Sequence, residues 1–145
     1  MKASDLFVKC LETEGVTKIF GIPGEENADL MISLKKSKIE FVLCRHEQAA
    51  AFMADVYGRL TGKAGVCLAT LGPGVTNLMT GLADANMDRA PVVAIIGQGS
   101  TERLHKESHQ IMDSISMVAP ISKWAQTILS AKNVTEVVRK AFKVA

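Results

Sequence analysis

Short apolar runs that alternate with helical segments are the feature of this sequence that most restricts its fold. We predict strands over residues 18–22, 39–44, 65–70, 91–96 and 121–129. A first helix is predicted to be capped by Ser4 and to end at Gly15, and a last one to begin at about Val134. Three further helices are predicted between them, over residues 27–37, 47–61 and 75–87. Apolar strands separated by helices are typical of a parallel sheet covered on both faces. We therefore expect an α/β fold with three layers, α/β/α, around a mostly parallel sheet.

The size and charge of the chain exclude several classes of protein. Its 145 residues fit one domain, and its 17 basic and 15 acidic residues are interspersed, without the basic stripe of a nucleic-acid-binding protein. No apolar stretch is long enough to span a membrane. The three cysteines lie far apart, which favours reduced thiols and a cytoplasmic protein. His105 and His109 have the spacing of an H-E-x-x-H zinc motif, but Lys106 stands where that motif has its glutamate. We therefore expect no metal site there.

Four loops follow the first four predicted strands, at the edge of the sheet where α/β proteins bind ligands. They are Gly21-Ile22-Pro23-Gly24, Arg45-His46-Glu47, Leu71-Gly72-Pro73-Gly74 and Gly97-Gln98-Gly99. Glycine lets a backbone approach a flat ligand closely, and proline fixes the turn. Neither glycine–proline loop is a P-loop, because no Gly-Lys-Ser or Gly-Lys-Thr follows, and the last loop lacks the third glycine of a dinucleotide-binding motif. The loops therefore predict a ligand site of another kind.

Glu47 is the residue with the most specific functional hypothesis. It follows the second predicted strand and begins a helix made mostly of alanine and other apolar residues. An acid in the first turn of a helix often does no more than complement the helix dipole, and this is one interpretation of Glu47. The catalytic interpretation requires its carboxyl to lie in a poorly solvated crevice and to share a proton with a ligand nitrogen. Taken alone, Glu47 leaves both interpretations open.

Three motifs that occur in a fixed order favour the catalytic interpretation. They are Phe20-Gly21-Ile22-Pro23-Gly24, Arg45-His46-Glu47-Gln48-Ala49-Ala50 and Thr70-Leu71-Gly72-Pro73-Gly74-Val75-Thr76-Asn77, each at the end of a successive strand. Segments 81–88 and 92–98 follow the same pattern. Together these motifs resemble the pyrimidine-binding domain of the acetolactate synthase and pyruvate oxidase family of thiamine-diphosphate enzymes, and most closely its catabolic acetolactate synthases. The resemblance extends over essentially the whole chain.

The resemblance implies a catalytic role for Glu47. In this family the corresponding glutamate hydrogen-bonds N1′ of the cofactor's aminopyrimidine and favours the tautomer that removes the C2 proton of the thiazolium. The resemblance further implies that the pyrimidine pocket and its walls are formed by Ile22, Pro23, Gly24, Thr70, Pro73 and Asn77. Gln110 lies in a region that faces the substrate in these enzymes. The implied reaction is the decarboxylative condensation of two pyruvates to 2-acetolactate.

The resemblance also implies that residues 1–145 are one pyrimidine-binding domain of a longer enzyme. These enzymes bind the diphosphate and Mg²⁺ through another domain with a Gly-Asp-Gly motif, which this sequence lacks. A second subunit completes the site in a homodimer or tetramer. We expect one more strand after the last helix, middle and diphosphate-binding domains outside this chain, and no activity of the isolated chain. FAD is compatible with the family but is not indicated here.

Three departures from the family pattern leave the substrate open. Glu25 and Glu26 follow the first glycine loop, where many relatives carry small residues and some decarboxylases carry an aspartate. Leu71 replaces the serine of the common Thr-Ser-Gly-Pro-Gly motif, and Ser108-His109-Gln110 differs from the Phe-Gln-Glu of many biosynthetic synthases. The cofactor interpretation is unaffected. The alternatives are a 2-oxo acid decarboxylase or oxidase of the same family, and a non-catalytic module that supplies a dimerisation surface and half of a cofactor site.

Overall fold

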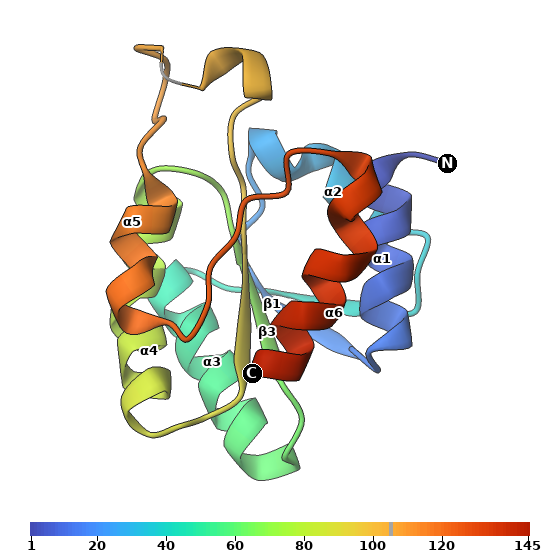
Figure 1. Ribbon diagram of the computed structural model, residues 1–145. Coiled ribbons are helices and arrows are strands. Elements are labelled where there is room, and N and C mark those ends of the chain that lie inside the picture. The colour runs from blue at the N-terminus through green and yellow to red at the C-terminus, as the bar shows by residue number, and fades with distance from the viewer. Residues whose placement is uncertain (105) are drawn as a thin grey trace.

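The computed structural model describes residues 1–104 and 106–145 and contains a four-stranded sheet (Figure 1). The strands are β1 (Lys18–Gly21), β2 (Glu40–Leu43), β3 (Gly65–Ala69) and β4 (Val92–Ile96), in the spatial order β2-β1-β3-β4. All neighbouring strands are parallel, and Phe20 of β1 pairs with Val42 of β2 and Cys67 of β3. The predicted α/β fold is therefore confirmed, with these strands close to their expected bounds.

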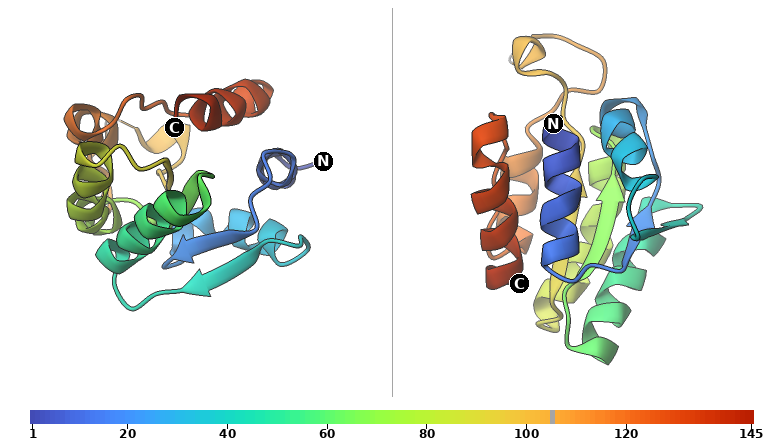
Figure 2. Two further views of the ribbon diagram at one scale, coloured as in Figure 1. Left: turned by 90° about the horizontal axis from the view of Figure 1, so that it is seen from below. Right: turned by 90° about the vertical axis from the view of Figure 1, so that its right-hand side faces the viewer.

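Helices join the strands and cover both faces of the sheet (Figure 2). They are α1 (Ala3–Thr13), α2 (Ala28–Leu34), α3 (Glu47–Thr61), α4 (Pro73–Met87), α5 (Ser114–Val118) and α6 (Val134–Val144). Side chains of α1, α2 and α6 pack on one face, with α6 beside α1, whereas α3 and α4 pack on the other. This arrangement gives the three layers that the sequence predicts.

Short 3₁₀ turns lie in the connections between these elements. They are η1 (Glu25–Asn27), η2 (Thr101–Arg103), η3 (Ala119–Ile121) and η4 (Ala131–Asn133). Two of them, η1 and η4, lead directly into α2 and α6. Among the described residues, no helix combines the length and the apolar character needed to cross a bilayer.

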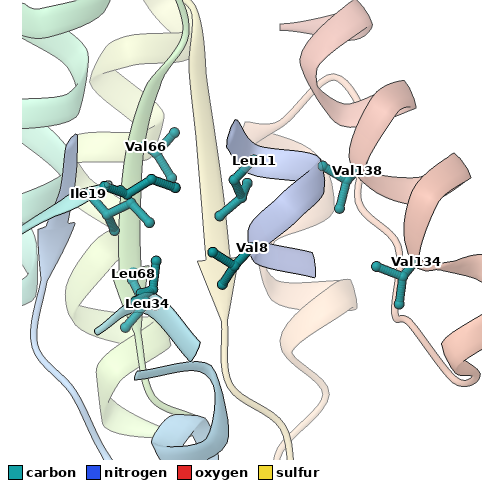
Figure 3. Packing of buried hydrophobic residues seen from close by; sticks show 9 residues of the cluster. Val8, Leu11, Ile19, Leu34, Val66, Leu68, Val134 and Val138 are labelled. Carbon is teal, nitrogen blue, oxygen red and sulfur yellow. The ribbon is translucent and has the colours of Figure 1, made fainter. Parts of the chain in front are cut away.

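The core on the α1 face consists of branched aliphatic side chains (Figure 3). Val66 and Leu68 of β3 point to this face, because alternate residues of a strand face opposite sides of the sheet. Leu11 of α1 belongs to the same buried cluster, and Val138 of α6 joins it on the side of α1. Complete burial of such a side chain contributes roughly 1.5–3 kcal/mol. This core therefore holds α1 and α6 on the sheet.

The core on the opposite face is built from small side chains. Ala50, Ala51 and Ala54 of α3 are each 0% exposed. A Cβ atom on Gly81 of α4 would lie 2.6 Å from Cβ of Ala51, and one on Gly65 of β3 would lie 1.9 Å from the carbonyl oxygen of Ala54. Such close approaches leave no room for larger residues. The alanine-rich helix thus sets a short distance between α3, α4 and the sheet.

The strand predicted over residues 121–129 is wrong. η3 ends at Ile121, and residues 122–129 form irregular backbone. Their apolar side chains contact helices instead: Ile128 packs against the α1-face core, and Nζ of Lys140 in α6 lies 4.7 Å from the ring centre of Trp124. A short apolar run does not specify a strand when helix surfaces can bury its side chains equally well.

Two predicted helix ends also differ because of polar side chains. Ser4 lies inside α1 and does not cap it; Lys2 precedes the helix, and its N–H donates to Oδ2 of Asp5 at 3.3 Å. The Ser4 hydroxyl instead accepts a hydrogen bond from Ser33 of α2 at 2.9 Å. The helix predicted over 27–37 is shorter, and the Ser37 hydroxyl donates to the carbonyl of Leu34 just after its end. Asp5 therefore makes the local capping contact of α1, and the Ser4 hydroxyl takes part in the contact with α2.

A groove of about 580 Å³ runs along the edge of β4 that does not pair with β3. It is lined by β4, by α1 and α6, and by the irregular segment after η3. Two buried polar atoms of lining residues, Nδ2 of Asn27 and Oγ of Ser114, have no hydrogen-bond partner among the described residues. Glu47 does not line this groove, but Gly97, Gln98 and Gly99 of the loop after β4 do, so the groove reaches the loops at the strand ends.

Candidate functional site

Loops that follow the parallel strands meet at one edge of the sheet. The backbone N–H of Ile22, after β1, donates to the carbonyl of Leu68 in β3 at 3.2 Å. The N–H of Gly97, after β4, donates to the carbonyl of Ala69 at the end of β3 at 2.9 Å. Because these bonds continue the sheet beyond its strands, the predicted loops are held side by side.

The turn after β2 places Glu47 at the start of α3. The N–H of Cys44 donates to the carbonyl of Gly21 at 2.9 Å and fixes the beginning of this turn. His46 precedes α3, and its Nδ1 accepts a hydrogen bond from the N–H of Gln48 at 3.1 Å. This bond satisfies one of the N–H groups that have no partner within a helix. His46 is therefore the cap that fixes the direction in which Glu47 leaves the backbone.

The carboxyl of Glu47 is buried and has a specific partner. Glu47 is 9% exposed, and Nδ2 of Asn77 in α4 donates a hydrogen bond to its Oε2 at 3.0 Å. Within the described part of the chain, no hydrogen bond reaches Oε1. An acid that only complements a helix dipole gains nothing from burial, because removing a charge from water is unfavourable. The position thus favours the functional interpretation of Glu47.

Three glycines from three loops surround Thr70, the residue after β3. A Cβ atom on Gly24 would lie 2.4 Å from Cβ of Thr70, and one on Gly97 would lie 3.2 Å from Cα of Thr70. A Cβ atom on Gly74 would lie 3.1 Å from Cγ2 of Thr70 and 3.7 Å from Oε1 of Glu47. The structure therefore brings Gly24, Thr70 and Glu47, which lie far apart in the sequence, into one small region.

The other predicted residues lie in the same loops but differ in exposure. Ile22 is half-buried against the α3-face core, whereas Pro23 and Pro73 are exposed. Pro73 is the first residue of α4, where the missing N–H of proline leaves no bond unmade. Gln110 is exposed, and a Cβ atom on Gly72 would lie 2.7 Å from Cβ of Gln110. Gln110 is thus adjacent to the third loop, although the two segments are distant in sequence.

An ion-pair cluster between α3 and α4 was not identified from the sequence. Asp55 is 2% exposed, and Arg59 donates to its two oxygens at 2.7 and 2.8 Å. Arg59 also contacts Asp84 at 3.3 Å and Asp88 at 2.6 Å. The hydrogen bond with Asp55 raises the pKa of Arg59 above its ordinary value. The i,i+4 spacing of Asp55 and Arg59 could have indicated their ion pair from the sequence, but it does not reveal the further partners Asp84 and Asp88.

The site is suited to a flat nitrogen heterocycle. The missing Cβ atoms of the glycines let the loop backbones pack closely on Thr70, and the carboxyl of Glu47 beside them can accept or donate a hydrogen bond. Within the described residues, no three His, Cys, Asp or Glu side chains are grouped to hold a metal ion. His105, and with it the His105–His109 pair, lies outside those residues. The side chains present thus fit the aminopyrimidine that the sequence motifs imply.

The chain belongs to the family described as "Thiamine pyrophosphate enzyme, N-terminal TPP binding domain", which matches residues 1–117. It is 43% identical over 144 residues to the acetolactate synthase of Bacillus subtilis (strain 168), a match that covers 99% of this chain and 25% of that protein. The catabolic acetolactate synthase of Raoultella terrigena is 45% identical over 142 residues, or 98% of this chain and 25% of the relative. The large subunit of Escherichia coli (strain K12) acetolactate synthase isozyme 2 is 41% identical over all 145 residues.

These comparisons confirm the resemblance that the three sequence motifs carry. Thiamine diphosphate is the cofactor of the family to which the chain belongs. The chain spans about a quarter of the length of the three relatives.

Proposed function

We propose that this chain is the pyrimidine-binding domain of a thiamine-diphosphate-dependent acetolactate synthase, which condenses two pyruvates to 2-acetolactate with loss of carbon dioxide. The observation that carries the proposal is the buried carboxyl of Glu47, held by Asn77 beside the glycine loops that pack on Thr70. Three relatives that are 41–45% identical are acetolactate synthases, which supports the choice of reaction.

In this proposal each loop residue has a role toward the pyrimidine ring. Glu47 hydrogen-bonds a ring nitrogen and exchanges a proton with it, which is general acid–base catalysis by a positioned carboxyl. Gly24 and Gly74 pack closely against Thr70, which brings the first and third loops together beside Glu47 to face the ring. The cofactor, when bound, supplies the electron sink for decarboxylation. Gln110, exposed beside the third loop, lies on the substrate side.

The rest of the site comes, in this proposal, from outside the chain. A second subunit contributes the domain that binds the diphosphate and Mg²⁺, so the isolated chain does not catalyse the reaction. The same half-site would serve a 2-oxo acid decarboxylase or oxidase of the family. The names of the relatives favour the synthase over these alternatives.

Glu47→Gln in the full-length enzyme tests the proposal directly. Glutamine keeps nearly the same shape but cannot exchange a proton as a carboxyl does. We expect C2 proton exchange of the bound cofactor and kcat to fall by about 10²–10⁴-fold. The melting temperature should change little, since an acid at a helix start contributes only ~0.3–1 kcal/mol through the dipole.

Glu25→Gln is the matched control, because Glu25 is an exposed acid in the 3₁₀ turn that follows the first glycine loop. It should exchange the C2 proton at the wild-type rate. Normal exchange in Glu47→Gln, accompanied by a small loss of stability, would support the helix-dipole interpretation and contradict the proposed function.

A further inference from the structure

Asn77 is joined to Glu47 across the interface of α3 and α4. It lies in the second turn of α4, is half-buried, and donates from Nδ2 to Oε2 of Glu47 at 3.0 Å. The sequence motifs assign Asn77 to the wall of the cofactor pocket. In the structure, however, its amide is engaged by the carboxyl of Glu47.

This hydrogen bond makes the two carboxyl oxygens of Glu47 different. Oε2 is occupied by Asn77, whereas Oε1 lies 3.7 Å from the point that a Cβ atom on Gly74 would occupy. The terminal torsion of a glutamate side chain has a broad energy minimum, so a free carboxyl changes its orientation easily. A fixed partner on one oxygen therefore keeps the other oxygen on the side of Gly74.

An asparagine suits this contact because its side chain is neutral and has both a donor and an acceptor. The NH₂ group can donate to an ionised carboxyl, and the carbonyl can accept from a protonated one after rotation of the amide. A lysine or arginine at this place would instead favour the ionised carboxyl strongly. The amide can thus hold Glu47 in both protonation states that proton exchange requires.

We propose that Asn77 is a positioning residue for Glu47 and not a wall of the cofactor pocket. It holds Oε2 so that Oε1 faces the ring nitrogen of the pyrimidine. The inference rests on the proposed function of Glu47 and adds a second residue that acts through it. It requires Asn77 to affect proton exchange more than the affinity for the cofactor.

Asn77→Leu in the full-length enzyme separates these two roles, because leucine is similar in size and cannot hydrogen-bond. We expect C2 exchange at saturating thiamine diphosphate to slow by about 10- to 100-fold, the effect of losing one hydrogen bond to a charged group. The Kd for the cofactor should stay within about threefold of wild type, which is under 1 kcal/mol. A wall residue gives the reverse result, a raised Kd with normal exchange at saturation.

A double-mutant cycle shows whether Asn77 acts through Glu47. Asn77→Leu combined with Glu47→Gln should exchange no more slowly than Glu47→Gln alone, because the two residues act as a unit. Additive losses would overturn the inference. Asn77→Asp should be slower than Asn77→Leu at neutral pH and should recover on acidification, when the introduced carboxyl becomes protonated and can donate.

Asn86→Leu is the matched control, because Asn86 is an exposed asparagine on the same helix. It should match wild type in both exchange and Kd. Slow exchange in Glu47→Gln with normal exchange in Asn77→Leu would refute the role of Asn77 and leave the proposed function intact. Normal exchange in Glu47→Gln would refute the proposed function, and the positioning role with it.

Discussion

At the scale of single residues, Cys67 shows how completely the centre of the sheet excludes water. It lies in the middle of β3 between two other strands and is 0% exposed. Burial raises the pKa of its thiol to about 12. A thiol that stays protonated is a poor nucleophile, so Cys67 is a packing residue and not a reactive one.

This pKa shift predicts that the thiol weakens the fold at alkaline pH. Its ordinary pKa is 9.0, so the unfolded chain loses this proton before the folded chain does. The stability linked to the thiol is present below pH 9.0 and is lost as the pH rises toward about 12. The loss has a limiting slope of about 1.4 kcal/mol per pH unit.

Urea denaturation at about pH 8 and about pH 10.5 measures this loss. Cys67→Ala should lose less stability between the two pH values than the wild-type chain. Cys10→Ala is the control, since Cys10 lies on α1 and is only partly buried, and it should show the wild-type loss. An equal loss in Cys67→Ala and wild type would contradict the prediction.

At the scale of elements, the contact between α3 and α4 determines the geometry of the candidate site. Glu47 begins α3 and Asn77 lies near the start of α4, so their 3.0 Å hydrogen bond depends on the separation of the two helices. Gly81 and Ala51 set this separation on the buried side. Arg59 joins α3 to α4 farther along both helices.

Gly81→Ala should therefore destabilise the protein although alanine is the better helix former. The added methyl would lie 2.6 Å from Cβ of Ala51. Overpacking typically lowers the free energy of unfolding by about 1–3 kcal/mol, and the higher helix propensity of alanine raises it by ~1 kcal/mol at most. We expect a net loss in chemical denaturation and a weaker Glu47–Asn77 contact.

Ala51→Gly combined with Gly81→Ala provides the control, because it moves the methyl from one helix to the other. The double variant should lose less stability than the sum of the two single variants. Strict additivity would show that the contact between Ala51 and Gly81 does not set the helix separation.

At the scale of the whole molecule, one stripe of α3 presents apolar side chains to solvent. Met53, Val56 and Leu60 follow the helical i, i+3, i+7 spacing and are 44%, 49% and 81% exposed. Clustered exposed apolar residues are typical of protein–protein contacts. We therefore expect this stripe to contact the second subunit that the proposed function requires.

The 145-residue chain should accordingly self-associate, which light scattering over a concentration series measures. Leu60→Lys should shift the equilibrium toward monomer, because it places a charge in the contact. Leu129→Lys is the control, since Leu129 is 59% exposed and lies outside α3. A monomer at all concentrations would refute the prediction, and dissociation by Leu129→Lys alone would place the contact at the β4 groove instead.

The alternation of apolar runs and helices was sufficient to predict the sheet and its layers. Glu47 through Thr61 matches α3 because alanine periodicity and the closing Gly62 are local signals. Residues 121–129 were misassigned, because whether an apolar run joins a sheet depends on a neighbour that lies far away in sequence. The additional strand expected after α6 stays a prediction.

The sequence alone determined the order of the first four strands and their helices and the loops at the strand ends, and it singled out Glu47 as the candidate catalytic residue. These follow from local spacing and from motifs that lie within a few residues. Only the tertiary structure decided which oxygen of Glu47 is held, because Asn77 reaches it across two helices that small residues allow to pack closely. Such a contact depends on the distance between elements, and no periodicity along the chain encodes that distance.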